Sequence, residues 1–145
     1  MIRLTTLALA SSLALLAATP SFAQTQGSCP TGSAGNSQPV WVLFDLGSAT
    51  VRKVDKPKIA EAVATAKNRQ AVRVCLVGQT DKLGDKAMNE RLALARSRAV
   101  AAEMIRGGYP GDKIVIATNP EAFGELHLGR ADSQEKDRRV TIVFR

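Results

Sequence analysis

The sequence predicts a small α/β (α+β) domain in which two helices pack on one face of a four-stranded mixed sheet. Three observations support this fold class. Short β-rich segments alternate with two longer segments of helical periodicity. Their order is strand, helix, strand, helix, strand, loop, strand, which is typical of helices layered on a sheet. The 145 residues, 45% of them hydrophobic, suffice for one domain with a modest core.

The first half of the predicted domain contains a strand, a helix and a second strand. Residues 39–45 (PVWVLFD) are β-rich and alternate weakly, so they predict the first strand. Residues 57–67 predict a helix, with Asp55 as its N-cap and Pro57 in its first turn. In the second strand Val72, Val74 and Leu76 are expected on the core side. The expected buried face of the helix consists of Ile59, Ala60, Val63 and Ala66.

The second half begins with the longest predicted helix, residues 85–106, which the glycines at 107 and 108 end. Residues 113–117 (KIVIA) predict a third strand, and residues 139–144 (RVTIVF) predict the closing strand. Residues 119–136 contain Pro, Gly and scattered charges, so they predict a long loop between these two strands. The expected buried stripe of the long helix consists of Leu92, Ala95, Ala99, Ala102 and Ile105.

The first 23 residues have the features of a cleaved signal peptide. Arg3 precedes an uncharged Leu/Ala-rich run, and small residues at 21 and 23 form the expected cleavage site. An uncleaved membrane anchor is the alternative, but it needs about 20 apolar residues and this run is shorter. The residues before Cys29 are not those that normally precede a lipidated cysteine. We therefore expect a periplasmic protein without a transmembrane or lipid anchor of its own, associated with the outer membrane only through a partner.

The charge of the chain points to an acidic partner. The formal net charge is +7, and it becomes +6 when Arg3 leaves with the signal peptide. In a cytosolic protein such a charge would suggest nucleic acid. Because export argues against nucleic acid, we expect acidic cell-wall polymers or lipid headgroups instead.

The two cysteines, Cys29 and Cys75, predict a disulfide, because an exported protein meets an oxidising compartment. Cys75 alternates with the core residues of the second strand, so it is expected on the sheet face away from the helices. The Gly/Ser-rich residues 24–38 predict an irregular lead-in that can cross this face and bring Cys29 to it. The alternative is a buried thiol at Cys75 and an unrelated Cys29.

No residue pattern predicts catalysis, a metal site or a cofactor. His127 is the one histidine of the chain, and it falls in the predicted long loop. The sequence contains no Ser/His/Asp grouping, no HExxH motif and no CxxC motif. A metal site would need several Cys, His or carboxylate ligands at close spacing. We therefore expect a non-catalytic protein.

The most informative segment is residues 78–100 (GQTDKLGDKAMNERLALARSRAV), where a strand passes into the long helix. Arg96 lies on an otherwise apolar helix face, where a guanidinium must be paired and hydrogen-bonded. Asp81, at the same junction, is its expected partner. Two interpretations remain open. The pair is either a structural ion pair, or an outward-facing pocket that holds the ammonium and the carboxylate of an amino-acid end.

This segment resembles the OmpA C-terminal-like family, which includes the Pal and MotB periplasmic domains. The resemblance extends to the closing segment 137–142 (DRRVTI) and to Phe44-Asp45 with Ser48-Ala49-Thr50, so it covers residues 41–145. The sequence departs from the family pattern at Gln79, Met88, Ala93 and Asp137, which surround the two charges. The residues that match the family pattern in the long segment are Gly78, Thr80, Asp81, Gly84, Asn89, Leu92 and Arg96.

The resemblance implies an OmpA-like domain at residues 39–145. It also implies non-covalent binding of peptidoglycan through the diaminopimelate residue of the stem peptide. Asp81 and Arg96 would make the charged contacts, and Arg139 would brace the pocket. Asn89, Thr80 and Asp45 would support the contacts by hydrogen bonds. The alternative is an interaction or assembly component that keeps the fold without wall binding and takes an envelope protein as its partner. An enzyme that acts on the wall is a third hypothesis.

Overall fold

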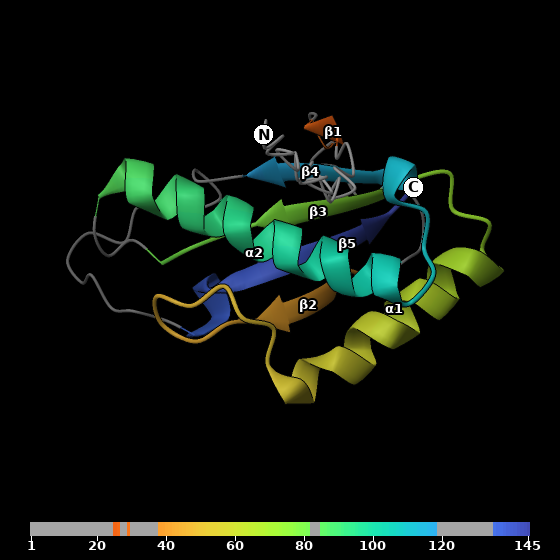
Figure 1. The fold of residues 1–145 in the computed structure, drawn as a ribbon, viewed down its shortest axis with the longest axis horizontal. Helices are drawn as coiled ribbons and strands as arrows, with labels where there is room; N and C mark the ends of the chain where they lie inside the picture. Colours follow the sequence, from red (N-terminus) through yellow and green to blue (C-terminus); the bar gives the residue numbers. More distant parts are fainter. Residues whose placement is uncertain (1–24, 27–28, 30–37, 82–84, 119–134) are drawn as a thin grey trace, which may run out of the picture.

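A mixed β-sheet forms the base of the fold, and its strand order is β1-β4-β3-β5-β2 (Figure 1). The central strand β3 pairs in parallel with β4 and antiparallel with β5, and β5 pairs antiparallel with β2. The predicted four-stranded mixed sheet is confirmed. The short β1, which pairs in parallel with β4, falls within the lead-in that we expected to be irregular. The strands are β1 (Thr25–Gln26), β2 (Val40–Leu43), β3 (Val74–Gly78), β4 (Ile114–Thr118) and β5 (Arg139–Phe144).

The structure is a computed structural model that describes residues 25–26, 29, 38–81, 85–118 and 135–145. The signal peptide predicted at 1–23, most of the lead-in, His127 and nearly all of the loop predicted at 119–136 lie outside these residues. Predictions for those segments stay predictions. Within the described residues no helix is long and apolar enough to cross a membrane.

Two helices, α1 (Lys56–Asn68) and α2 (Lys86–Arg106), cover one face of the sheet (Figure 1). Asp85 caps α2, because its carboxylate accepts a hydrogen bond from the Met88 N–H at 3.0 Å. The helix ends at the glycine pair, and Gly108 adopts a φ of 81° that a side chain would disfavour. Three short 3₁₀ turns complete the described elements: η1 (Lys53–Asp55), η2 (Gly111–Lys113) and η3 (Glu135–Asp137).

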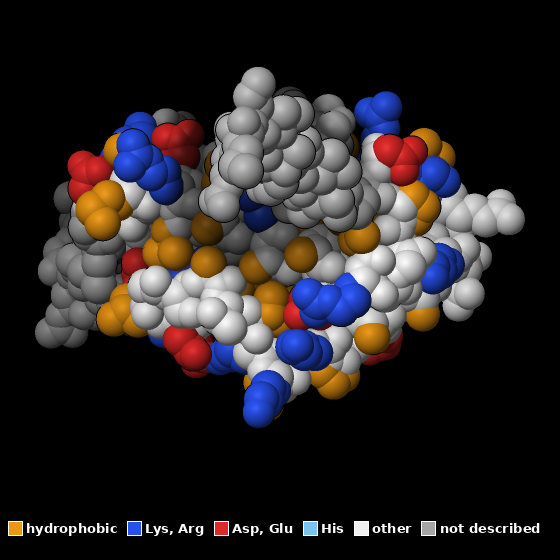
Figure 2. All heavy atoms as spheres, viewed as in Figure 1, with side chains coloured by type: hydrophobic (Ala, Val, Ile, Leu, Met, Phe, Trp, Pro, Cys, Tyr) orange, Lys and Arg blue, Asp and Glu red, His pale blue; other side chains and the backbone are white. Residues whose placement is uncertain are grey.

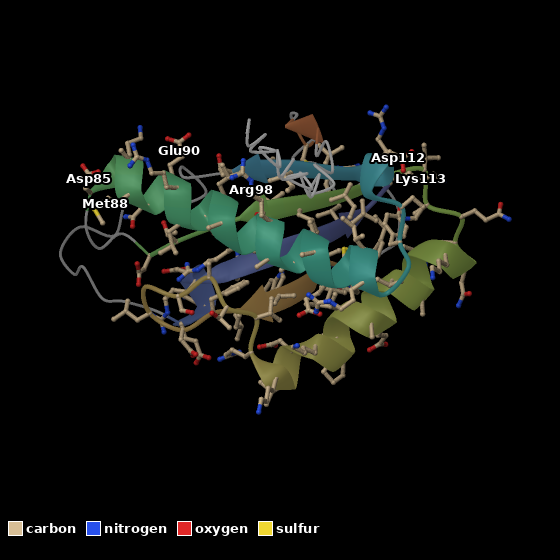
Figure 3. The ribbon with its side chains drawn as sticks, viewed as in Figure 1. Asp85, Met88, Glu90, Arg98, Asp112 and Lys113 are labelled. Atoms are coloured by element: carbon tan, nitrogen blue, oxygen red, sulfur yellow. A yellow bond between two sulfur atoms is a disulfide. The ribbon has the colours of Figure 1, made fainter. Side chains whose placement is uncertain are left out.

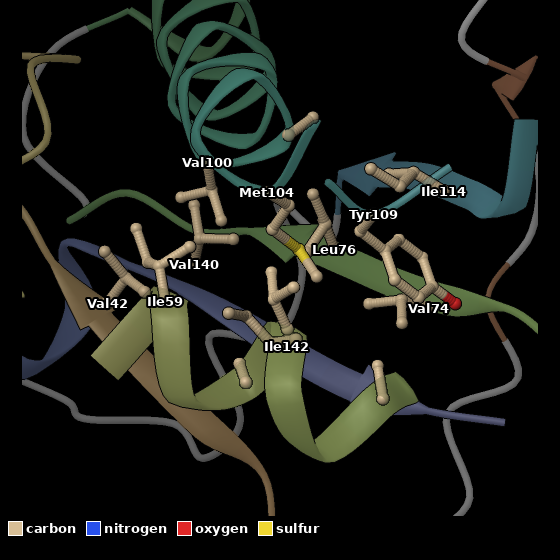
Figure 4. Packing of buried hydrophobic residues seen from close by; sticks show 14 of the residues in the cluster. Val42, Ile59, Val74, Leu76, Val100, Met104, Tyr109, Ile114, Val140 and Ile142 are labelled. Carbon is tan, nitrogen blue, oxygen red and sulfur yellow. The ribbon is translucent and has the colours of Figure 1, made fainter. Parts of the chain in front are cut away.

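The core lies between the helices and this face of the sheet (Figure 4). Alternate residues of each strand point into it, so the paired positions Val74↔Ile114 and Leu76↔Ile142 both face the helices. Branched aliphatic side chains fill most of the space, since only 4% of the residues are aromatic. Burial of each such side chain contributes about 2 kcal/mol. The core residues labelled in Figure 4 are Val42, Ile59, Val74, Leu76, Val100, Met104, Tyr109, Ile114, Val140 and Ile142.

The structure corrects the predicted buried faces of both helices. In α1, Ala62 is buried in place of Ala60, which is exposed. In α2, the buried residues lie about one position away from the predicted ones. They include a polar and a charged side chain, so the apolar pattern alone does not identify the buried face. Val72 was also expected in the core, but it precedes β3 and is exposed. The buried residues of α2 are Ala93, Arg96, Ser97, Val100, Ala101 and Met104.

Asp55 was expected to cap α1, and the structure gives it another role. Its side chain makes no capping hydrogen bond. Instead the fully buried carboxylate accepts hydrogen bonds from Arg52 Nε and Lys58 Nζ, both at 2.7 Å. Burial alone would raise the pKa of Asp55, but the hydrogen bonds from Lys58 and Arg52 outweigh it and hold the pKa below its ordinary value. Arg52 also contacts Glu135 at 2.8 Å, so this network joins the start of α1 to the segment before β5.

The opposite face of the sheet carries Cys75, which forms a disulfide with Cys29. The two Cα atoms lie 5.9 Å apart, within the usual range for a disulfide. Cys75 lies between Val115 on β4 and Val143 on β5. The predicted disulfide and its place on the face away from the helices are therefore confirmed in the structure. The bond fixes Cys29 to the central strand of the sheet.

Replacement of both cysteines by serine should lower the free energy of unfolding by about 4 kcal/mol at most. The disulfide joins residues 46 positions apart, and without this closed loop the unfolded chain gains conformational entropy. Urea denaturation of the double variant and of the oxidised protein measures this difference. Equal midpoints for the two proteins would show that the disulfide does not stabilise the fold.

Candidate functional site

The candidate site lies where β2 and β3 end and β5 begins (Figure 1). Here α2 approaches the sheet closely, because Gly78 at the end of β3 has no side chain. A Cβ atom at Gly78 would lie 2.3 Å from the Ala93 carbonyl oxygen and 2.6 Å from Ser97 Oγ. This contact places the next turn of α2, and with it Arg96, against the loops that follow β2 and β3.

Arg96 is fully buried and binds three backbone carbonyls through its guanidinium group. Nε donates to the Ser48 carbonyl at 2.8 Å, Nη1 to the Gln79 carbonyl at 3.2 Å, and Nη2 to the Asp45 carbonyl at 3.1 Å. The guanidinium carbon also lies 5.3 Å from the centre of the Phe44 ring, a cation–π distance. One side chain thus holds the loop after β2 and the loop after β3 in fixed positions.

The charge of Arg96 is balanced by a neighbouring carboxylate. Burial lowers the pKa of Arg96 below its ordinary value, the negative charge of Asp81 opposes this effect, and the positive charge of Arg138 adds to it. Arg138 Nη1 lies 3.6 Å from Asp81 Oδ2, which is an ion pair rather than a hydrogen bond. Arg138 Nε also donates to the Phe44 carbonyl at 3.2 Å. Two guanidinium groups and one carboxylate therefore share the site.

The expected outward orientation of the Asp81–Arg96 pair is wrong for Arg96. Its side chain has no exposed surface, and Asp81 retains 5% of its accessible surface. The physical reason is that backbone carbonyls can hydrogen-bond a guanidinium, so Arg96 does not need a carboxylate in direct contact. Asp81 influences Arg96 through its charge, and it forms an ion pair with Arg138. Arg96 is a positioning residue in this structure.

The three residues expected to support the charges have different environments. Asn89 donates from Nδ2 to the backbone carbonyl of Asp81 at 3.4 Å, so it fixes the loop rather than the carboxylate. Thr80 is buried next to Asp81. Asp45 offers its carbonyl to Arg96, while the residue itself is exposed at the surface. Asn89 lies on α2, and Thr80 and Asp45 lie in the loops whose carbonyls Arg96 binds.

Arg139, which was expected to brace the pocket, lies on the opposite face of the sheet. Its guanidinium carbon is 4.5 Å from the centre of the Trp41 ring, and its Nη1 donates to the Lys136 carbonyl at 3.1 Å. Because Val140 faces the core, alternation along β5 turns Arg139 to the other side. The preceding residue, Arg138, takes the place beside Asp81. Sequence reasoning missed Arg138, although the adjacent arginines were the signal that could have found it.

The arrangement can bind charged groups. Among the described residues, no group of three or more His, Cys, Asp or Glu side chains could hold a metal ion. Arg138 can contact a carboxylate, and Asp81 and Asp45 can contact an ammonium. An arginine has five N–H donors, and Arg96 uses three of them on the carbonyls described above.

Comparison with known proteins identifies the family of this chain. The pattern of the OmpA family matches residues 43–141. Among curated proteins, the outer membrane protein Omp38 of Acinetobacter baumannii is 27% identical over 99 residues, which is 68% of this chain and 27% of that protein. The probable lipoprotein YiaD of Escherichia coli is 28% identical over 107 residues, covering 71% of this chain and 47% of that protein. The chain therefore matches less than half of the length of these relatives.

Solved structures show the same fold. The peptidoglycan-associated lipoprotein of Burkholderia pseudomallei superposes with a TM-score of 0.63 at 22% identity, covering 72% of this chain and 89% of that one. The OmpA-like domain of FopA1 from Francisella tularensis gives a TM-score of 0.61 at 23% identity, with 72% and 69% covered. The C-terminal domain of Helicobacter pylori MotB gives 0.61 at 16% identity, with 73% and 84% covered.

The contact between α2 and Gly78 can be tested directly. Replacement of Gly78 by alanine should lower the free energy of unfolding by about 3 kcal/mol, because α2 must move away from β3 to admit the methyl group. Gly111 is the control: a Cβ there would meet the end of the Ile105 side chain at 3.2 Å, so Gly111→Ala should cost about 1 kcal/mol or less. Urea denaturation measures both. Equal stabilities of the two variants would contradict the close packing.

Proposed function

The chain belongs to the OmpA family, and from this premise we propose that it is a non-catalytic peptidoglycan-binding module of the cell envelope. We propose further that it recognises the diaminopimelate residue of the stem peptide. The free end of that residue carries an ammonium and a carboxylate on one carbon. Such a ligand needs one negative and one positive group of the protein at close range.

The observation that carries the proposal is the meeting of these charges at the carboxyl end of β3. Asp81 and Arg138 come from separate segments and lie 3.6 Å apart. In the proposed complex each of these two side chains binds one charge of the ligand directly. Its carboxylate would bind Arg138, and its ammonium would bind Asp81, with Asp45 at the surface nearby. Arg96 would hold the loops and contribute positive charge from behind.

An assembly role without wall binding is the second candidate. It is favoured by the burial of Arg96 and Asp81, which is what a purely structural charge cluster would show. In that case the domain would bind an envelope protein through another surface. The two functions differ in whether the charges of Asp81 and Arg138 matter for binding to the wall.

A sedimentation assay with purified sacculi distinguishes the two functions. Asp81→Asn removes one charge at nearly constant shape, and Arg138→Gln removes one charge with a shorter amide side chain that also gives up the hydrogen bond to the Phe44 carbonyl. Each should weaken binding about tenfold or more, because a charge-assisted contact is lost. Arg96 is left intact, since its replacement would release two loops and confound the result.

Two controls match the variants in chemistry. Asp112→Asn and Arg98→Gln change exposed residues, one in η2 and one on the outer side of α2 (Figure 3), and should bind like the wild type.

Sacculi with lysine in place of diaminopimelate lack the free amino-acid end and should bind weakly. Equal binding to both kinds of sacculi would reject diaminopimelate as the target. Equal binding by all four variants would reject the site, and absence of binding by the wild type would favour the assembly role. Muropeptides released from the sacculi would instead indicate an enzyme.

A further inference from the structure

Basic residues meet at the end of the sheet opposite the candidate site. Arg73 precedes β3 and pairs with Arg145 after β5, since the N–H of each donates to the carbonyl of the other at 3.2 and 2.9 Å. Lys113 precedes Ile114, the β4 partner of Val74, so it lies beside Arg73 on the other side. Three neighbouring strands thus place Lys113, Arg73 and Arg145 next to one another. Strands lie about 4.8 Å apart, so Arg73 lies about half of one Debye length (about 10 Å at 0.1 M salt) from each of the other two residues.

The end of α1 extends this surface. Lys67 donates from Nζ to the Gly107 carbonyl at 3.2 Å, which brings the end of α1 to the end of α2. Arg69 follows in the turn that leads to β3. We call Lys67, Arg69, Arg73, Lys113 and Arg145 the basic end. Figure 2 shows Lys and Arg side chains at this end, on the right, with an acidic side chain among them, and further Lys and Arg side chains elsewhere on the same face. Figure 3 places Asp112 and Lys113 there.

The basic end brings like charges close together. Like charges directly opposite each other on neighbouring strands are destabilising. Asp112 lies next to Lys113 and offsets part of this charge, but Arg73 and Arg145 face each other across a hydrogen-bonded pair. A surface of this kind attracts anions from solution.

An exposed apolar side chain lies within the basic end. Val72 is 72% exposed and stands directly before Arg73. A free phosphate or a soluble polyanion would gain nothing from this valine. A membrane surface would, because its headgroup region accepts apolar side chains while its anionic lipids attract the surrounding Lys and Arg. Charge and apolar exposure together therefore favour a membrane.

We propose that the basic end docks on a membrane surface of anionic phospholipids, with Val72 entering the headgroup region. This docking is independent of the proposed wall binding. The candidate site lies at the carboxyl end of β3 and the basic end at its start, and the five residues of β3 span about 17 Å. Both ends can therefore be occupied at the same time, and the domain would bridge a membrane and the wall.

Cosedimentation with vesicles tests the proposal, using the protein as it is purified from the cell envelope. The probes are phosphatidylglycerol/phosphatidylethanolamine vesicles and vesicles of phosphatidylcholine alone. The wild type should bind the anionic vesicles, and R73E/K113E should bind them about tenfold or more weakly. The control pair K86E/R98E changes the net charge equally on α2 and should lose much less. V72S should bind the anionic vesicles about threefold more weakly, yet bind inorganic polyphosphate like the wild type.

Each contrary result overturns the proposal. Unchanged vesicle binding by R73E/K113E would exclude the basic end, and an equal loss in K86E/R98E would show an effect of net charge alone. Unchanged vesicle binding by V72S would indicate a site for soluble polyanions rather than a membrane. Circular dichroism and sacculus binding of R73E/K113E should match the wild type. If the variant were misfolded, the neutral pair R73Q/K113Q would replace it, with an intermediate loss expected.

Discussion

The buried side chain of Arg96 determines the structure of the candidate site. The guanidinium of Arg96 has no exposed surface and donates to carbonyls of Asp45, Ser48 and Gln79. Removing a charge from water costs several kcal/mol unless hydrogen bonds and opposite charge compensate. The carbonyls, the Phe44 ring and the charge of Asp81 supply this compensation. The loops after β2 and β3 cannot move without losing it, so the geometry of the candidate site depends on Arg96.

The charged residues of the site therefore have different roles. Arg96 is fully buried and organises the backbone, whereas Asp81 and Arg138 form an ion pair and retain some exposed surface. Arg139, on the other side of the sheet, stacks on Trp41. The neighbouring residues Arg138 and Arg139 thus lie on opposite faces of the sheet, because successive side chains of an extended chain point in opposite directions. A substitution at Arg96 would test the fold, while substitutions at Asp81 and Arg138 test recognition.

The fold followed from the sequence more completely than the site did. Period-two and period-3.6 patterns identified β5 and both helices nearly to their ends, because apolar residues recur in these elements with the period of a strand or a helix. The pattern failed in α2, where the buried row contains Arg96 and Ser97, which a hydrophobicity argument assigns to solvent. The sequence also identified Asp81 and Arg96 as neighbours. It could not show that backbone carbonyls, which carry no side-chain signature, would bind the guanidinium.

The most direct test of this account is the hydrogen exchange of arginine Nε–H groups, measured by NMR on the ¹⁵N-labelled protein. Arg96 Nε donates to Ser48 at 2.8 Å in a buried site, whereas Arg98 is exposed on the same helix. The account predicts that the Nε–H of Arg96 exchanges about 100-fold or more slowly than that of Arg98. Equal exchange rates for the two groups would show that Arg96 is open to solvent and does not hold the loops.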